Sequence, residues 1–531
     1  MASLSPRGRG LTEVGVDGKP EPWQSDGTAL TVVVFGASGD LAKKKTYPAL
    51  FTLYKSGVLP SAFLVCGYAR SSKSDAQFVD QIRPYLQKSV KDAGDEASLN
   101  AFLGRCVYRS GQYDDSNRLS EVAEEMRKMQ GEDIASENRM YYLALPPSVF
   151  VKVAASIRTS GMSSTGWTRV VVEKPFGRDT SSARALARDL GTIFPEKNLY
   201  RIDHYLGKEM VQNLCVLRFS NAFLEPLWNR NFIDSVQITF KEDIGTFGRG
   251  GYFDTSGIIR DVMQNHLMQV LSIVAMEPPV KVAGEGYSNY VRDEKVKVLK
   301  CMRPIDPNDV VIGQYTQGGD NPGYLDDPSV PEGSNTETFA TVVLYIDNPR
   351  WQGVPFIMKA GKALEQRKAE VRVQLKQQPG AAAMFDVADA SELPRNEFVF
   401  RIQPSEAIYF KTNVKRPGLE TLPVQSEMDL SYHIRYPNAE LHDAYVRLVL
   451  DVLRGKQATF VRDDELLAAW EIFTPLLERI ERGEIKVHAY PFGSRGPAAS
   501  DELIKRAGYI HNAEYGREWV LRKNNNGNAN L

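Results

Sequence analysis

The first long apolar run of the chain covers residues 30–35 and contains three consecutive valines. A continuous run of this kind is typical of a strand buried on both faces of a parallel sheet. Further apolar runs at 63–66, 141–145 and 169–172 alternate with segments of helical periodicity. This alternation predicts a doubly wound, Rossmann-like α/β domain over residues 29–205.

The pattern changes in the second half of the chain. Residues 235–240, 338–346, 369–375 and 398–403 mostly alternate apolar with polar positions. Alternation with a period of two is typical of antiparallel strands that have one covered face. We therefore expect an α+β domain over residues 206–520, built around a large antiparallel sheet.

Helical periodicity also predicts two late helices, over residues 444–453 and 465–480.

The two ends of the chain differ from the rest. Residues 1–28 and 521–531 are rich in small or polar residues and carry no periodic apolar pattern. Such composition predicts disordered tails.

Composition narrows the class of protein. With 531 residues, 42% of them apolar, the chain is long enough for several domains with well-filled cores. The net charge of −1 gives no reason to expect nucleic acid or a membrane surface as a partner. No apolar run is long enough to span a membrane, and the N-terminus lacks a signal-peptide core. We expect a soluble, intracellular protein.

The four cysteines are scattered along the chain without a Cys-x-x-Cys pair or a Cys/His cluster. This distribution predicts free thiols in a reducing compartment and no metal site. The last three residues, Ala529–Leu531, loosely match the Ser-Lys-Leu peroxisomal address. We expect a cytoplasmic protein and keep a peroxisome-like organelle open.

A small-residue turn follows the first predicted strand, with Gly36, Gly39 and Ala42 spaced three apart. Small residues between a strand and a helix let the backbone approach a dinucleotide pyrophosphate at the helix N-terminus. The alternative is an ordinary tight turn that needs glycine. The second predicted strand ends without an acid for a ribose hydroxyl, and Arg70 follows it. An arginine there accommodates the 2′-phosphate of NADP.

The stretch from Asp203 to Lys208 packs an acid, an imidazole, a phenol and an ammonium into six positions. Apolar residues that recur after it predict a helix beginning at Leu206 or Gly207. A helix N-terminus together with His204 and Lys208 would bind an anion such as a phosphate. The alternative is that Asp203 only caps the helix and His204 is structural.

Five runs carry a resemblance to the glucose-6-phosphate dehydrogenase family. Residues 36–45, 173–177, 201–209, 257–267 and 358–368 are similar to family motifs, in the same order. The resemblance implies NADP-dependent oxidation of D-glucose 6-phosphate at C1 to 6-phospho-D-glucono-1,5-lactone. This reaction opens the oxidative pentose phosphate pathway and produces NADPH.

The resemblance also implies residue roles. His266 would be the catalytic base, since removal of a hydride from an alcohol carbon requires a base poised near neutral pH. Asp203 would orient it. The implied substrate-binding residues are Lys174, His204, Tyr205, Lys208, Glu242, Asp261, Lys362, Arg367 and Gln403. The implied cofactor-binding residues are Gly36, Ala37, Ser38, Gly39, Asp40, Leu41, Lys45, Arg70 and Lys174.

His266 lies in a segment that is expected to form a helix. With α-helical spacing, Asp261 and Asn265 fall on one face and His266 lies further round. Without the family context, a lone histidine within a helix is usually a core residue. We also hypothesise that the Lys174–Pro175 bond is cis or changes isomer, because proline lies there at a hinge between the predicted domains.

Two expectations rest on the resemblance alone. A homodimer or homotetramer would form through the large sheet. Some family members hold a second, structural NADP, and Lys368, Arg372, Arg401, Lys411, Asp429 and Arg495 match positions in that site. Lys359 stands where those members have arginine, and an ammonium cannot repeat a bidentate guanidinium contact.

Two other functions compete with this interpretation. A dehydrogenase of another sugar would turn over glucose without a phosphate. A non-catalytic NADP-binding regulator would be expected to lack the base or the cofactor turn, yet Asp203, Lys174 and His266 are all present.

Overall fold

The computed structural model describes residues 28–131, 134–419 and 421–510. The predicted tails lie outside these residues, except for residue 28, which begins the first strand. The chain forms two compact units, each built from separate segments. Unit 1 comprises Met1–Asn221, Gly251–Ile305 and Asn438–Ile485, and unit 2 comprises Ala222–Gly250, Asp306–Pro437 and Lys486–Leu531. Unit 1 thus includes two segments that follow residue 206.

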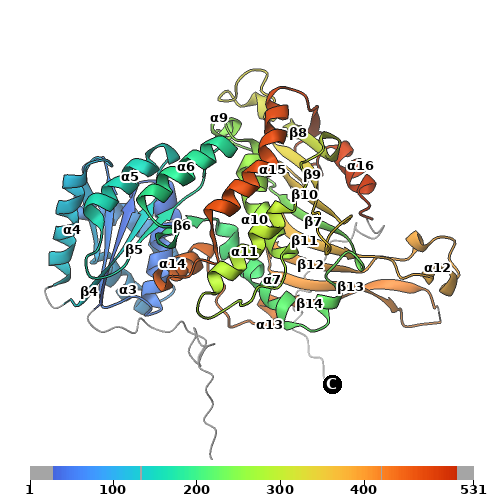
Figure 1. The fold of residues 1–531 in the computed structure, drawn as a ribbon, viewed down its shortest axis with the longest axis horizontal. Helices are drawn as coiled ribbons and strands as arrows, with labels where there is room; N and C mark the ends of the chain where they lie inside the picture. Colours follow the sequence, from blue (N-terminus) through green and yellow to red (C-terminus); the bar gives the residue numbers. More distant parts are fainter. Residues whose placement is uncertain (1–27, 132–133, 420, 511–531) are drawn as a thin grey trace, which may run out of the picture. The chain divides into compact units, whose positions relative to one another are not determined.

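In the described part of unit 1, seven strands form one sheet in the order β15-β6-β5-β4-β1-β2-β3 (Figure 1). Strands β1 to β6 run parallel. Their bounds are Thr28–Phe35, Ala62–Ala69, Cys106–Ser110, Ser136–Leu143, Thr168–Val172 and Leu199–Ile202. The order 3-2-1-4-5-6 is that of the Rossmann fold, so the predicted fold class is confirmed.

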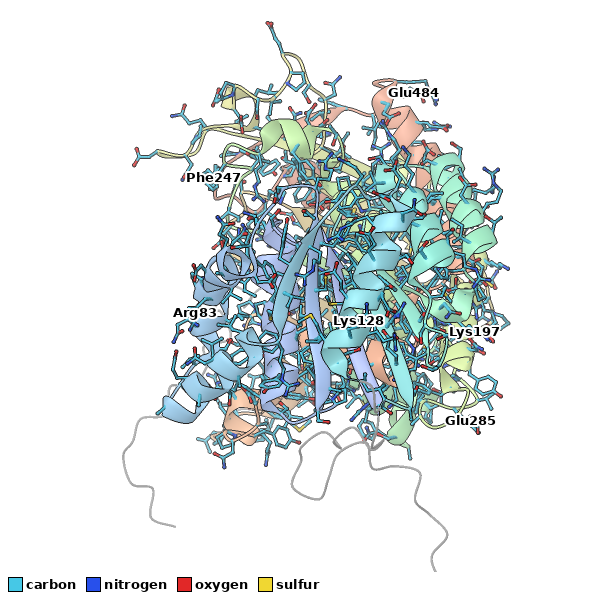
Figure 2. The ribbon with its side chains drawn as sticks, turned by 90° about the vertical axis from the view of Figure 1, so that its left-hand side faces the viewer. Arg83, Lys128, Lys197, Phe247, Glu285 and Glu484 are labelled. Atoms are coloured by element: carbon cyan, nitrogen blue, oxygen red, sulfur yellow. The ribbon has the colours of Figure 1, made fainter. Side chains whose placement is uncertain are left out.

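The parallel sheet forms because its strands are apolar on both faces. Every residue of β1 is buried, as the continuous apolar run predicts. Helix α4, for example, is amphipathic, and charged side chains such as Lys128 point away from the sheet (Figure 2). The bounds of α1 to α6 are Tyr47–Lys55, Asp75–Leu86, Ala93–Leu103, Ser116–Gln130, Phe150–Ser156 and Thr180–Ile193.

Two elements from late in the chain complete unit 1. Helix α14 (Ala444–Arg454) packs Tyr445, Leu448 and Val449 into the hydrophobic core of the parallel sheet. Its orange-red ribbon lies beside the blue strands in Figure 1. Strand β15 (Phe460–Val461) pairs antiparallel with β6. The other α-helices of unit 1 are α7 (Glu209–Ser220), α10 (Met268–Ala275), α11 (Tyr287–Lys300) and α15 (Asp463–Glu481), and α9 (Gly250–Asp254) crosses its border.

Nine described strands form the sheet of unit 2, in the order β14-β13-β12-β11-β7-β10-β9-β8-β16. Their bounds are β7 Ile233–Lys241, β8 Val310–Thr316, β9 Phe339–Tyr345, β10 Pro355–Gly361, β11 Lys368–Leu375, β12 Glu397–Gln403, β13 Ala407–Lys415, β14 Pro423–Ser431 and β16 Val487–Pro491. The short helices α8, α12, α13 and α16 cover Leu224–Leu227, Ala381–Met384, Tyr432–Arg435 and Ala498–Arg506.

The large sheet differs from the prediction in two respects. It is mostly antiparallel, but β7 pairs parallel with β10 and β8 pairs parallel with β16. In addition, β7, β9, β10 and β11 are buried almost throughout, so both faces of these strands are covered. The alternating polar residues include buried charges such as Glu370 and Arg372, which pair with each other. Pairing makes burial of these charges tolerable, which is why alternation did not mark a solvated face.

Several local predictions can be compared directly. Helices α14 and α15 match the two predicted late helices. The four cysteines are free, as predicted. The Lys174–Pro175 bond is cis, in agreement with the hypothesis. No described helix has both the length and the apolar character needed to cross a membrane.

Candidate functional site

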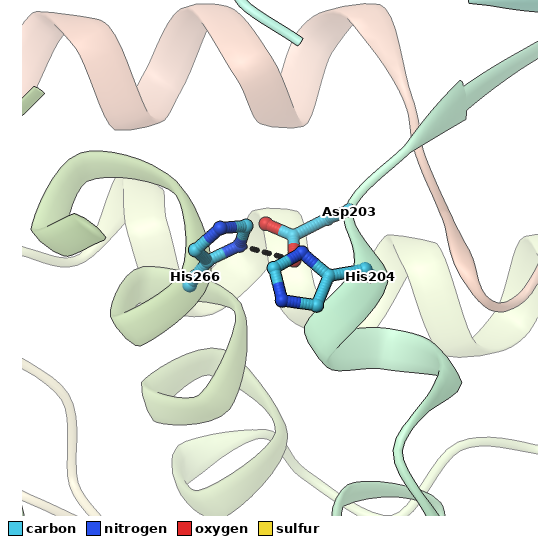
Figure 3. Close-up of side chains that lie close together, drawn as sticks. All are labelled: Asp203, His204 and His266. Atoms are coloured by element: carbon cyan, nitrogen blue, oxygen red, sulfur yellow. Dashed lines mark hydrogen bonds and ion pairs between the residues drawn. The ribbon is translucent and has the colours of Figure 1, made fainter. Parts of the chain in front are cut away.

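Asp203 and His266 meet at the end of the parallel sheet of unit 1. Nδ1 of His266 lies 2.6 Å from Oδ1 of Asp203 (Figure 3). The two side chains are only 4% and 3% exposed, respectively. A buried carboxylate bonded to one ring nitrogen selects the tautomer that carries its proton there. Nε2 is then left as a proton acceptor.

Asp203 stands directly after β6, at the carboxyl edge where ligands of open α/β sheets bind. Its Oδ1 also accepts a hydrogen bond from the backbone N–H of Tyr205, at 2.9 Å. Through this bond Asp203 caps a 3-10 turn, His204–Gly207, rather than the predicted helix. Helix α7 begins only at Glu209, after Lys208. The prediction of a helix from residue 206 or 207 was wrong, because apolar periodicity does not distinguish a 3-10 turn from the first turn of an α-helix.

Aromatic rings enclose His266. The Tyr205 ring stacks on it with centroids 4.8 Å apart, and the His204 ring meets it edge-on at 4.4 Å. Lys208 places its Nζ 5.1 Å from the centroid of the Tyr205 ring. The predicted anion-binding residues and the predicted base therefore lie in one cluster.

Burial and charge set the protonation of this cluster. Burial lowers the pKa of His266 below its ordinary value, while Asp203 acts to raise it. Burial would raise the pKa of Asp203, but the charge and hydrogen bond of His266 lower that pKa to about 2. The pKa of His204 lies well below its ordinary value, mainly because of burial. Near neutral pH the cluster therefore holds a carboxylate and two neutral imidazoles.

Asp261 and His266 lie on a π-helix, Ile259–Leu267. In an α-helix five residues make about 1.4 turns, so the two side chains would point about 140° apart. Hydrogen bonds of a π-helix join residues i and i+5, so the same five residues make roughly one turn. The prediction assumed α-helical spacing, whereas the structure has a π-helix over these residues.

Lys174 contacts the first turn of this π-helix. Its Nζ donates to the main-chain oxygen of Asp261 at 2.8 Å and lies 3.2 Å from Oδ1 of the same residue. Both side chains are about one-third exposed, at 31% and 37%. Lys174 and Asp261 thus offer a cation and an acid beside the dyad.

Asp203, His204 and His266 also form a group that could hold a metal ion, with ligand atoms within 4.8 Å of one another. However, the 2.6 Å separation of Nδ1 and Oδ1 is a hydrogen-bond length. Two ligands of one tetrahedral Zn²⁺ would be roughly 3.3 Å apart, since each lies about 2 Å from the ion. We therefore interpret the group as an acid–base pair.

The small-residue turn and Arg70 lie at the same edge of the sheet. Gly36 has a φ of +78°, and a Cβ there would lie 2.2 Å from the main-chain oxygen of Ala144. The turn therefore requires glycine. Arg70 follows β2, is exposed, and places its guanidinium 5.7 Å from the centroid of the Tyr113 ring. Lys45 pairs with Asp443 at 2.7 Å.

Family models for two domains match the chain. Residues 33–213 match "Glucose-6-phosphate dehydrogenase, NAD binding domain" and residues 215–519 match "Glucose-6-phosphate dehydrogenase, C-terminal domain". The chain belongs to the glucose-6-phosphate dehydrogenase family. The two matched domains meet between residues 213 and 215.

Relatives of this family match the chain over nearly its whole length. Glucose-6-phosphate 1-dehydrogenase of Dictyostelium discoideum is 53% identical over 494 residues, which are 92% of this chain and 96% of that protein. A cytoplasmic isoform of the enzyme from Solanum tuberosum is also 53% identical, over 92% and 94% of the two chains. A solved glucose-6-phosphate dehydrogenase in complex with glucose 6-phosphate has 44% identity and a TM-score of 0.85, and covers 91% of this chain and 99% of its own.

The remaining substrate residues implied by the family lie in unit 2. Glu242 follows β7 and Lys362 follows the parallel strand β10, and their side chains pair at 2.5 Å. Arg367 precedes β11, and Gln403 ends β12. Because β11 runs antiparallel to both β7 and β12, all four residues lie at one end of the large sheet. Their role in binding the substrate stays a prediction.

The basic residues implied for a second NADP are also in unit 2, and several have acidic partners. Lys368 and Arg372 both contact Glu370, at 2.9 and 2.7 Å. Lys359, the departure from the family pattern, is buried 3.7 Å from Asp501, and burial lowers its pKa to about 8.

Two residues near the dyad were missed by the sequence analysis. Glu173 is buried and accepts a hydrogen bond from the hydroxyl of Tyr142, and burial raises its pKa to about 7. Tyr445 stacks parallel to His204, with centroids 6.2 Å apart, and its ring lies beside Nζ of Lys45. An acid at the end of an apolar strand was a signal for Glu173. The sequence contains no comparable signal for Tyr445, because this residue fits the apolar face of α14.

We predict that Asp203→Asn lowers the pKa of His266 by about one to three units. The carboxylate raises this pKa in the native protein, so removal of its charge leaves the effect of burial unopposed. NMR titration of the histidine ring signals measures the change. Asp451→Asn, which removes another buried carboxyl of unit 1, is the control and should leave His266 unchanged. An unchanged midpoint in Asp203→Asn would contradict the assigned pairing.

Proposed function

We propose that the protein oxidises D-glucose 6-phosphate at C1 to 6-phospho-D-glucono-1,5-lactone with NADP⁺ and produces NADPH. The activity of the relatives supports this reaction. The observation that carries the assignment to residues is the buried 2.6 Å contact between His266 and Asp203. This places the protein at the first step of the oxidative pentose phosphate pathway.

His266 acts as the general base. Asp203 accepts the proton of Nδ1, so Nε2 takes the proton of the C1 hydroxyl as the carbonyl forms. The imidazolium that results lies against a carboxylate, which stabilises its positive charge. Lys174 approaches the oxygen at C1, and Asp261 binds a sugar hydroxyl.

The substrate phosphate binds at the 3-10 turn. His204 and Tyr205 project from two positions of this turn, and Lys208 projects from the residue after it. Lys208 supplies the charge, and charge-assisted hydrogen bonds are the strong ones. The neutral imidazole of His204 donates one further bond.

The residues of unit 1 fit NADP. Gly36 to Leu41 form a turn that only small residues can make at its first position, and Arg70 would pair with the 2′-phosphate. Lys45 and Lys174 would lie between cofactor and substrate. When bound, NADP⁺ supplies the acceptor for the C1 hydride. Glu242, Lys362, Arg367 and Gln403 are proposed as further substrate-binding residues.

We also propose a homodimer or homotetramer and a cytoplasmic location. The edge strand β14 presents exposed residues such as Met428, which is 60% exposed and available to a second copy. One relative is a cytoplasmic isoform. The peroxisome-like ending, Ala529–Leu531, lies outside the described residues and stays a prediction.

His266→Asn is expected to lower kcat for glucose 6-phosphate by about 100-fold or more, because the base is lost while the phosphate contacts remain. NADPH absorbance measures the rate, and calorimetry should show that glucose 6-phosphate still binds. His433→Asn, at an exposed histidine, is the control. A His266 variant as fast as the wild type would refute the base assignment. A wild-type protein without activity would support the alternative function of a non-catalytic NADP-binding regulator.

Lys208→Ala is expected to lower the preference for glucose 6-phosphate over glucose by about 10- to 100-fold, because one charge-assisted contact to the phosphate is lost. The ratio of kcat/KM for the two sugars measures this preference. Lys197→Ala is the control in the same unit. An enzyme that oxidises both sugars equally well before substitution would support the alternative sugar dehydrogenase.

Arg70→Ala is expected to raise KM for NADP⁺ by about 10- to 100-fold and to leave KM for NAD⁺ nearly unchanged, because only NADP⁺ carries the 2′-phosphate. Steady-state kinetics with each cofactor make the comparison. Arg83→Ala, on α2 of the same unit, is the control. Equal losses with both cofactors would contradict the proposed contact.

A further inference from the structure

The π-helix that carries His266 needs a physical cause, because this geometry is rare and frequently marks a functional site. The side chain of Asn265 bridges it. Its Nδ2 donates to the main-chain oxygen of Arg260 at 3.0 Å, and its Oδ1 accepts from the backbone N–H of His266 at 2.7 Å. Asparagine side chains compete with the backbone for hydrogen bonds in this way. Asn265 thus spans the turn that ends at His266.

The other end of this turn is fixed to the rest of unit 1. Arg260 donates through Nε to the main-chain oxygen of Arg178 at 2.9 Å and pairs with Glu481 of α15 at 2.6 Å. Its side chain is only 13% exposed. Lys174, four residues before Arg178, bonds to the neighbouring oxygen of Asp261. The first turn of the π-helix is therefore anchored, and Asn265 connects this anchor to the backbone of His266.

We propose that Asn265 is a positioning residue for oxidation of the sugar: its amide holds the wide turn in which His266 reaches Asp203. The proposal rests on the proposed function, in which His266 is the base. Asn265 acts through His266 and the main chain. Nothing in its role requires contact with substrate or cofactor.

This role has consequences that differ from simple stabilisation. The phosphate-binding residues stand on another element, the turn after β6, and Asp261 lies in the first turn that Lys174 anchors. Loss of the Asn265 bonds should therefore leave substrate binding largely intact. If the π-helix relaxes toward α-helical spacing, His266 rotates away from Asp203. Asp203 raises the pKa of His266, so the pKa of His266 would fall. The acid limb of the kcat/KM profile would then move to lower pH.

The experiment compares Asn265→Leu and Asn265→Ala with Asn198→Ala. Asn198 is a matched control, since it is equally half-buried in unit 1 and its Nδ2 donates to the main-chain oxygen of Thr168 at 2.6 Å. We expect kcat to fall about 10- to 100-fold in the Asn265 variants, because small misplacements of a catalytic group have effects of this size. KM for glucose 6-phosphate should change less than about threefold by the same argument.

The NMR midpoint of His266 is measured alongside the kinetics, and it should fall in both Asn265 variants and stay constant in Asn198→Ala. Unchanged kcat, or a lower kcat with an unmoved acid limb and midpoint, would overturn the proposal, since a purely structural loss only reduces the folded fraction. The midpoint needs no turnover. A wild type without activity would therefore refute the proposed function, while the midpoint would still test whether Asn265 sets the pairing of His266 with Asp203.

Discussion

The hydrogen bond between Asp203 and His266 constrains much of unit 1. A buried carboxylate is tolerated only when it is paired and hydrogen-bonded, because its desolvation costs several kcal/mol. One oxygen of Asp203 meets two donors, the N–H of Tyr205 and the imidazole of His266. The first fixes the turn after β6, and the second requires a helix from more than sixty residues later to arrive at the same place. Folding and the proposed chemistry thus depend on the same contact.

The sequence was informative wherever one segment determines its own structure. The runs that became β1, β2 and β5 are apolar on both faces, and such runs are typical of strands in a covered parallel sheet. Arg70 could be placed at the edge of the sheet because it directly follows a strand that ends without an acid. Likewise, Asp203, His204 and Lys208 were grouped because six residues cannot spread far. These predictions rest on local geometry.

The sequence was less informative where distant segments decide the structure. The apolar periodicity of α14 and β15 does not indicate that they join unit 1, because their apolar residues could pack into the core of either unit. For the same reason Tyr445 was not singled out, although its ring lies beside both His204 and Nζ of Lys45. The π-helix was not predicted either, since apolar spacing over nine residues fits α-helical and π-helical periods almost equally well. The hydrogen bonds of Asn265, Arg260 and Lys174 hold this helix in the π-helical form. Most of their partners lie on distant segments, so the sequence does not reveal them.

Strand direction explains how unit 2 gathers its charged residues. In a purely antiparallel sheet, neighbouring strands end at opposite edges, so residues that follow two adjacent strands lie far apart. The parallel pairing of β7 with β10 removes this separation. Glu242 and Lys362 both follow the carboxyl end of their strands and can therefore form an ion pair. The central parallel pair thus brings two charged side chains together at one edge of a mostly antiparallel sheet, as parallel strands do throughout an α/β sheet.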